Sequence, residues 1–435
     1  MKKYRVLNLL VSFIFIFNAS NALGKVYIDI LSPSSTRLPI LIPEFKKAAG
    51  LPDKKNLAKK MSRVITDDLN FTGFFRILDP KAVDRSLLDG VTSNKIKWDV
   101  LSIIGAETIV TGKIIIKAQG RIAVELRLFD ALQGKLITGK KYEGKAEDYR
   151  LIAHKFSNEI FGKLTGERSS FETKIAFEKS IRSNKDIFLS DYDGANEKKI
   201  TAYNSLTLSP AWSPDGRNIA FTSYKGGNPD LYIKNIFNGN TRKISSKQGI
   251  NISPAWSPDG EKIALTLSLN NGNSEIYIIT LKDRKLERVT NNWATDVSPS
   301  WSPDSQKIAF VSSRSGNPHI YTLDLKTQKI KRLTYNGKYN TSPAWSPDGK
   351  IIAYTGLKNT YNIYIVSTDG LQRNQLTLNQ GNNEDPSWSP DSNFLAFSSD
   401  RTGQKEIFIM RADGRNQKKI TSGSGNKSSP AWSPN

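Results

Sequence analysis

Few side chains in this sequence have the chemistry of a catalytic centre. The chain has two histidines, His154 and His319, and no cysteine. It therefore offers neither a cysteine nucleophile nor a cluster of imidazole and thiolate ligands for a transition metal. A G-x-S-x-G nucleophile elbow is also absent from the sequence. Glu384 and Asp385 form a carboxylate pair, but neighbours on a strand point to opposite faces and cannot act as a facing acid and base. We expect no catalytic residue, no cofactor and no metal.

One group of acidic residues recurs in a fixed setting, the turn that follows a tryptophan. In Ser213-Pro214-Asp215-Gly216 the serine, proline and glycine suit the first, second and fourth positions of a type I turn. Oxygen ligands must converge to bind a metal. We therefore interpret the recurring acids as turn formers. They are Asp215, Asp259, Asp304, Asp348 and Asp391.

The tryptophans that precede these turns define a repeat. They are Trp212, Trp256, Trp301, Trp345, Trp388 and Trp432. Successive tryptophans lie 44, 45, 44, 43 and 44 residues apart, within the period of about 40 to 45 residues of a four-stranded propeller blade. Alternation along Pro-Ala-Trp points each ring to one face of a strand. We predict that these rings pack between blades.

The two ends of the repeat region predict how the ring closes. The first unit has three strand-like segments, Lys174 to Phe177, Ile187 to Ser190 and Lys198 to Thr201, but no tryptophan strand before them. Ser429 to Asn435 supplies a tryptophan strand with nothing after it. We predict an all-β, six-bladed propeller over residues 169–435, closed by the C-terminal strand, because closure removes exposed sheet edges.

The region before the repeats lacks the tryptophan motif and combines helix-like and strand-like patterns. Residues 1–24 combine early lysines, a short apolar run and small residues, which predicts a signal peptide cleaved near residues 22–24 and a mature chain without a transmembrane segment. Residues 25–168 predict a small α/β domain. Its expected helices are near 56–69, 97–104 and 152–164, and its expected strands are 25–30, 40–45, 74–78, 107–116, 121–129 and 136–142.

The charge balance is strongly basic. The formal net charge is +22, which favours association with anionic partners. The lysines and arginines are spread over most segments, so a generally basic, solvated surface explains the charge as well. Nucleic acid is not an expected partner because the tryptophans are used in the repeat and the signal peptide predicts export.

Both regions resemble the TolB family, the periplasmic component of the Tol-Pal system of Gram-negative envelopes. The resemblance is carried by the Trp-Ser-Pro-Asp-Gly repeats, with Asp191-Tyr192-Asp193-Gly194 in the first blade. In the N-terminal region it lies in Lys25 to Ile30, Arg37 to Ile40, Ile42 to Phe45 and Phe161 to Gly166, so that it covers essentially the whole mature chain.

The resemblance implies a periplasmic protein-protein interaction component that supports outer-membrane integrity and cell division. TolB-like proteins hold the peptidoglycan-associated lipoprotein Pal with the propeller. They engage TolA with the extended segment at the mature N-terminus, here residues 25–33. Its alternation suits strand addition to a partner sheet, although it also suits the first strand of the α/β domain. The residues expected to contact TolA are Lys25, Val26, Tyr27, Ile28, Asp29 and Ile30.

Strand direction selects the rim of the propeller on which Pal is expected. The loops before each tryptophan strand vary most, and variable loops on a rigid ring are where partner sites are built. The candidate contacts are Gln248, Gly249, Ile250, Asn251, Asp296, Val297, Asn340, Glu384, Asp385, Arg314, His319 and Arg401.

Two other functions stay open at this stage. Propellers also host hydrolases and lyases, because a fold does not decide function. A basic periplasmic protein that binds polyanions is the second alternative, and a salt titration would distinguish it.

Overall fold

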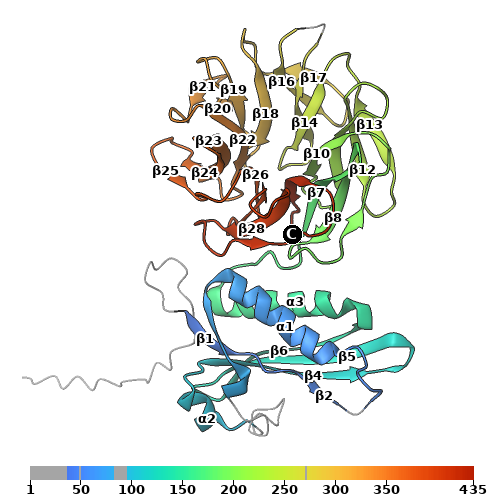
Figure 1. Cartoon of the computed structure of the whole chain (residues 1–435), viewed down its shortest axis with the longest axis vertical. Coiled ribbons are helices and arrows are strands. Elements are labelled where there is room, and N and C mark those ends of the chain that lie inside the picture. Colours follow the sequence, from blue (N-terminus) through green and yellow to red (C-terminus); the bar gives the residue numbers. More distant parts are fainter. Residues whose placement is uncertain (1–36, 49, 83–95, 270–271) are drawn as a thin grey trace, which may run out of the picture.

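The computed structural model of the chain describes residues 37–48, 50–82, 96–269 and 272–435 (Figure 1). The predicted signal peptide and the predicted TolA segment, Lys25 to Ile30, lie outside the described residues. An N-terminal domain with strands and helices is followed by a six-bladed β-propeller, and both parts of the predicted fold class are confirmed.

The N-terminal domain is built on one mixed sheet. Its strand order is β3-β1-β4-β5-β6, with β2 also paired to β4. The pairs that involve β1 and β2 are parallel, and β4, β5 and β6 form an antiparallel meander. The strands are β1 (Leu38–Leu41), β2 (Lys46–Lys47), β3 (Phe75–Leu78), β4 (Thr108–Ile116), β5 (Arg121–Asp130) and β6 (Lys135–Lys145).

Two long helices cover the face of this sheet that is turned toward the propeller (Figure 1). They are α1 (Leu57–Thr72) and α3 (Tyr149–Thr165), while the short α2 (Trp98–Ile103) lies at the opposite end of the domain. Leu57, Met61 and Ile65 lie on one stripe of α1 and are buried, which gives the helix its core face. Short 3₁₀ turns occupy Pro80–Ala82, Ala118–Gly120 and Ala146–Asp148.

One predicted strand differs from the structure. Residues 40–45 were expected to form a single strand, but β1 ends at Leu41 and pairing resumes only at Lys46. Pro43 explains the interruption because proline has no N–H group to donate to a neighbouring strand.

The propeller consists of six four-stranded antiparallel sheets. In each blade we call the innermost, tryptophan-bearing strand A and the following strands B, C and D. The blades are β30-β7-β8-β9, β10-β11-β12-β13, β14-β15-β16-β17, β18-β19-β20-β21, β22-β23-β24-β25 and β26-β27-β28-β29.

The strands of the propeller have the following bounds. They are β7 (Lys174–Ile181), β8 (Asn184–Asp191), β9 (Lys198–Lys199), β10 (Thr207–Trp212), β11 (Asn218–Ser223), β12 (Asp230–Asn235), β13 (Thr241–Ser245), β14 (Asn251–Trp256), β15 (Lys262–Leu267), β16 (Glu275–Thr280), β17 (Leu286–Arg288), β18 (Asp296–Trp301), β19 (Lys307–Ser312), β20 (His319–Asp324), β21 (Ile330–Arg332), β22 (Tyr339–Trp345), β23 (Ile351–Leu357), β24 (Tyr361–Ser367), β25 (Arg373–Gln375), β26 (Asn383–Trp388), β27 (Phe394–Ser399), β28 (Glu406–Arg411), β29 (Lys418–Lys419) and β30 (Lys427–Trp432).

The C-terminal strand closes the ring, as the sequence predicts. β30 pairs antiparallel with β7, and Trp432 lies opposite Ile175. The backbone N–H of Ser433 donates to the carbonyl oxygen of Lys174 at 2.8 Å, and the Ser433 hydroxyl accepts from the Lys174 N–H at 2.9 Å. The first and last segments of the propeller therefore share one blade.

The indole N–H groups of the tryptophans are not all bonded in the same way. The Trp212 Nε1 donates to the carbonyl oxygen of Ala431 in the preceding blade at 3.0 Å, and Trp301 and Trp388 make the equivalent bond. The Trp256 Nε1 is buried with no hydrogen-bond partner in the described part of the chain, and the Trp345 Nε1 bonds within its own turn. The same residue is therefore held differently in alternate blades.

Candidate partner-binding rim of the propeller

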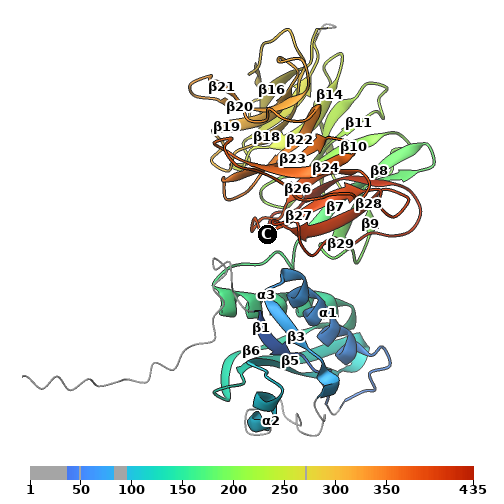
Figure 2. The same cartoon turned by 60° about the vertical axis from the view of Figure 1, so that its left-hand side comes forward.

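The candidate site is the rim formed by the D–A and B–C loops, on which the tryptophan strands begin. Strand direction places the A–B and C–D turns on the opposite rim, beside the N-terminal domain (Figure 2). The chosen rim therefore faces away from the junction between the domains. Its loops start and end on strands whose register is fixed by the blade, which gives a partner a rigid platform.

Three of the predicted contact residues are the first or second residues of A strands, and their side chains lie inside the ring. Asn251, Asp296 and Asn340 are each 0% exposed. Asn251 and Asn340 join the end of one blade to the beginning of the next: the Ser245 hydroxyl donates to the Asn251 side-chain oxygen at 2.6 Å, and the Asn340 amide donates to the Thr334 hydroxyl at 3.2 Å. Asp296 instead pairs with Arg314 of its own blade. Contact of these three residues with a partner stays a prediction.

His319 belongs to the same kind of buried network. Its Nδ1 accepts from the Asn340 side-chain amide at 2.9 Å and lies 3.3 Å from the Thr334 hydroxyl. Burial, with a smaller effect of the Arg332 charge, lowers the pKa of His319 to about 4. The imidazole is therefore neutral at physiological pH and serves as a hydrogen-bond acceptor between blades.

The two predicted arginines are half-buried and already bonded. Arg314 forms an ion pair with Asp296 at 2.7 Å. Arg401 donates to the side-chain oxygens of Asn383 and Gln417, each at 2.6 Å. Both guanidinium groups hold the rim loops in place through these bonds. The shape of the loops therefore depends on the two arginines even if they do not contact a partner.

Glu384 and Asp385 occupy a bulge at the centre of the ring. Asp385 has a positive φ of 56°, and the pairing register of β26 shifts there. Its carboxylate accepts from Ser342 at 2.9 Å and Ser429 at 3.4 Å, hydroxyls of the two neighbouring A strands. Burial raises the pKa of Asp385. Glu384 forms an ion pair with Lys405 instead, so the two carboxylates have separate partners.

The remaining predicted residues lie on the surface of one loop and the start of another. Gln248 is exposed, while Gly249, Ile250 and Val297 are half-buried. Gly249 has a φ of 96°, and a Cβ there would lie 2.1 Å from the carbonyl oxygen of Ser268. Only glycine fits this position, which fixes the shape of the loop.

Sequence reasoning missed the largest exposed apolar side chains of this rim. Trp293 is 80% exposed, Tyr335 68% and Leu378 62%. They lie in three successive D–A loops, before β18, β22 and β26. We call them the apolar crescent. Their signal in the sequence is a large apolar residue in an otherwise polar loop, whereas the predicted contact residues lie next to the tryptophan strands.

The loops of this rim are also basic. They contain eight lysines and arginines against one acid, Asp400. The basic residues are Arg182, Lys225, Lys247, Arg314, Lys338, Lys358, Arg401 and Lys405. The opposite rim instead carries the five turn aspartates, and the serine hydroxyl two residues before each of them donates to its carboxylate at 2.5 to 2.6 Å. The two rims therefore differ in charge.

One group of described side chains has the composition of a metal site, and it lies outside this rim. His154, Asp191 and Asp193 place ligand atoms within 4.8 Å of one another. Lys174 and Arg150 already pair with the two aspartates, which leaves little negative charge for a divalent cation. Separately, no helix among the described residues is long and apolar enough to span a bilayer.

Comparison with protein families identifies both parts of the chain. Residues 161–435 match the model described as the TolB beta propeller domain, and residues 26–137 match the TolB amino-terminal domain. The Tol-Pal system protein TolB of Desulfosudis oleivorans is 38% identical over 200 residues, which are 46% of this chain and 45% of that protein. The one from Syntrophotalea carbinolica is 39% identical over 196 residues, 45% of each chain. These matches span slightly less than half of each relative.

A solved structure matches over nearly the whole chain. The crystal structure of TolB from Acinetobacter baumannii superposes with a TM-score of 0.80 at 28% identity, and the match covers 94% of this chain and 100% of that one. A putative TolB from Agrobacterium tumefaciens, at 22% identity and a TM-score of 0.50, shares the fold. The order of the two domains is thus the same as in a solved relative.

Proposed function

This chain belongs to the TolB family, and from that premise we propose that it acts in the periplasm as a non-catalytic binding component of the Tol-Pal system. In this proposal the D–A rim of the propeller binds the lipoprotein Pal, and the segment Lys25 to Ile30 binds TolA. The complex would support outer-membrane integrity and cell division.

The observation that carries the Pal proposal is the apolar crescent on a basic rim. Exposed tryptophan and tyrosine side chains are the residues that most often dominate binding energy at protein interfaces. Trp293, Tyr335 and Leu378 stand on a closed ring and lose little conformational freedom on binding. The lysines around them favour a partner with an acidic face.

The TolA proposal rests on the sequence of the N-terminal segment. Val26, Ile28 and Ile30 alternate with polar residues, which suits addition of a strand to the edge of a partner sheet. The segment lies outside the described residues, and its binding is tested by deletion.

The Pal proposal is tested by measuring affinity for the soluble domain of Pal by calorimetry. We expect Trp293→Ser with Tyr335→Ser to weaken binding at least tenfold, because each side chain contributes on the order of 1 kcal/mol or more. Phe237→Ser is the matched control, since Phe237 is 77% exposed but lies in a C–D turn on the opposite rim. Equal affinities for the two variants would refute the proposed surface.

A pull-down from envelope extract separates the two partner sites. A mature chain without Lys25 to Pro33 should retain Pal and lose TolA. Retention of TolA by the shortened chain would refute the role of the segment without affecting the Pal site.

The basic rim gives one rival function, binding of a polyanion. Polyanion binding falls steeply with salt because counterions are released. Tight binding of single-stranded DNA that weakens strongly between about 50 and 200 mM salt would support this rival, and weak binding at about 150 mM salt would exclude it.

A further inference from the structure

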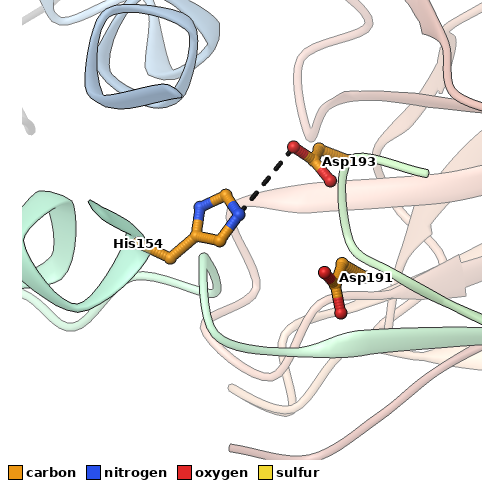
Figure 3. A group of neighbouring side chains, drawn as sticks. All are labelled: His154, Asp191 and Asp193. Carbon is orange, nitrogen blue, oxygen red and sulfur yellow. Dashed lines mark ion pairs between the residues drawn. The ribbon is translucent and has the colours of Figure 1, made fainter. Parts of the chain in front are cut away.

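The junction between the two domains contains a buried histidine surrounded by carboxylates (Figure 3). His154 on α3 is 3% exposed, and Asp68 on α1 is 1% exposed. The turn between β8 and β9 brings Tyr192 and Asp193 of the propeller to the same place. Three segments from two domains therefore meet around one imidazole ring.

One side of this ring is fully bonded. The His154 Nδ1 lies 2.9 Å from Asp68 Oδ2, and the Tyr192 hydroxyl donates to Asp68 Oδ1 at 2.5 Å. The Tyr192 ring also packs edge-on against the imidazole, with ring centres 5.5 Å apart. Asp68 thus links His154 to the propeller, and because a carboxylate only accepts, the Nδ1 must carry a proton.

The other side of the ring faces the propeller. The Nε2 is buried, lies 3.9 Å from Asp193 Oδ2 and has no hydrogen-bond partner among the described residues. Figure 3 shows this nitrogen directed at Asp193. A neutral ring would direct a lone pair at a carboxylate oxygen, whereas an imidazolium would direct an N–H at it. The second arrangement is attractive.

The charges around the ring agree with an imidazolium. The acidic groups are Asp67 and Asp68 from α1 and Asp191 and Asp193 from the propeller turn, and Asp67 is influenced by the nearby cations Lys418 of the propeller and Arg63 of α1. The cations are Arg150 from α3, which pairs with Asp193, and Lys174 from β7, which pairs with Asp191. A protonated His154 places a positive charge beside Asp68 and Asp193, the two carboxylates whose charges act on it. A divalent ion in its place would lie beside the guanidinium group of Arg150, which is unfavourable.

We propose that His154 is a pH-dependent latch between the domains, which holds the N-terminal domain on the propeller while it is an imidazolium and loosens it when it loses its Nε2 proton. Burial alone lowers the pKa of His154, but the charge and hydrogen bond of Asp68 and the charge of Asp193 outweigh burial and the opposing Arg150, so that the pKa is raised. The latch is therefore complete below about pH 6.5 and is lost as the pH rises through the raised value.

Other contacts across the junction do not titrate in this range. The Asn416 amide donates to the carbonyl oxygen of Phe71 at 3.0 Å, and Arg411 donates to that of Thr72. Phe71 also stacks on Phe394 with ring centres 4.8 Å apart. Deprotonation of His154 should therefore loosen the junction without separating the domains.

The test measures the distance between the domains in the full mature chain. The protein has no cysteine, so Leu132→Cys and Phe237→Cys place one spin label on each domain at exposed positions. We expect a narrow distance distribution at pH 6 that broadens at pH 9. His154→Gln should be broad at both pH values, while His319→Gln, the matched control, should respond as the unaltered chain does.

Proton NMR of the two imidazoles gives an independent readout. The His154 resonance, assigned by its loss in H154Q, should titrate with a midpoint above 6.5, and Asp68→Asn should lower that midpoint. Three results would overturn the latch: a midpoint below 6.5, a distance distribution that does not change with pH, or a zinc-induced shift of the His154 resonance, which would make the ring a metal ligand.

Discussion

At the scale of single residues, the two histidines show how surroundings decide the charge of the same side chain. His154 faces Asp68 and Asp193 and has a raised pKa, whereas His319 accepts from Asn340 and Thr334 and has a pKa lowered to about 4. The stabilising contact of His154 is therefore lost as the pH rises, whereas that of His319 is lost as the pH falls.

The lowered pKa of His319 makes the propeller sensitive to acid. Its folded-state pKa lies below the ordinary 6.5, so its contribution to stability is present above pH 6.5 and is lost as the pH falls toward 4. Asn362 occupies the equivalent place in the next blade and accepts from Thr377 at 3.0 Å. In the unaltered chain, protonation of His319 should lower the free energy of unfolding by on the order of 2 kcal/mol between pH 7.5 and 4.5. We expect His319→Asn to abolish this part of the pH dependence. Urea unfolding at both pH values measures it, and an equal acid-induced loss in the variant would contradict it.

Two tryptophans offer a paired test of the buried hydrogen bond between blades. Trp212→Phe removes a donor from the carbonyl oxygen of Ala431, whereas Trp256→Phe removes an N–H for which the described residues provide no acceptor. We expect the first change to lower the free energy of unfolding by about 1 kcal/mol more than the second, because an unpaired buried N–H already costs free energy. Chemical denaturation of both variants is the measurement, and equal losses would show that the bond contributes nothing.

At the scale of elements, β30 has the most unusual position, because it is the A strand of a blade whose other strands come from the beginning of the propeller. Deletion of Ser429 to Asn435 removes Trp432 and exposes the inner edge of β7. We expect the truncated chain to lose its cooperative thermal transition. Deletion of Asn435 alone is the control, since that residue is exposed and lies outside β30. A truncated chain that melts like the full one would refute the closure role.

Strands and helices were predictable where apolar periodicity decides them. The expected helix at 56–69 corresponds to α1, and the expected strand at 107–116 corresponds to β4. The bulges of the A strands were not predictable. Ser209, Ser253 and Ser298 have φ values of 53°, 53° and 56°, although serine rarely adopts this region. Hydrogen bonds from neighbouring blades, such as that from the Ser298 N–H to Thr266, hold these bulges, and a single-strand pattern contains no trace of such partners.

The candidate site was predictable only in part. Strand direction predicts the rim, but the predicted contact residues Asn251, Asp296 and Asn340 lie where the loops enter the A strands and are buried there. The junction around His154 could not be predicted from the sequence for a different reason. Its partners Asp68 and Tyr192 lie far apart in the sequence, and only the docking of two domains brings them together.

At the scale of the whole molecule, the propeller has a basic rim facing away from the N-terminal domain. If Pal binds there through an acidic face as proposed, the positive charges of the rim lysines should raise the association rate. We expect the association rate to fall severalfold between about 50 and 300 mM salt and to lose most of this dependence in the triple variant Lys225→Gln, Lys338→Gln, Lys358→Gln. Stopped-flow fluorescence measures the rate. A salt dependence that the triple variant leaves unchanged would place the steering charge elsewhere.

The closing blade also sets the order of events when the protein is made. β7 emerges from the ribosome some 250 residues before its partner β30, so the ring cannot close before β30 has been synthesised. Until Trp432 is available, the inner edge of β7 has no native partner. If the chain is exported as proposed, this late closure would keep the propeller open until β30 is available, and the unclosed form is the one that holdase chaperones would protect.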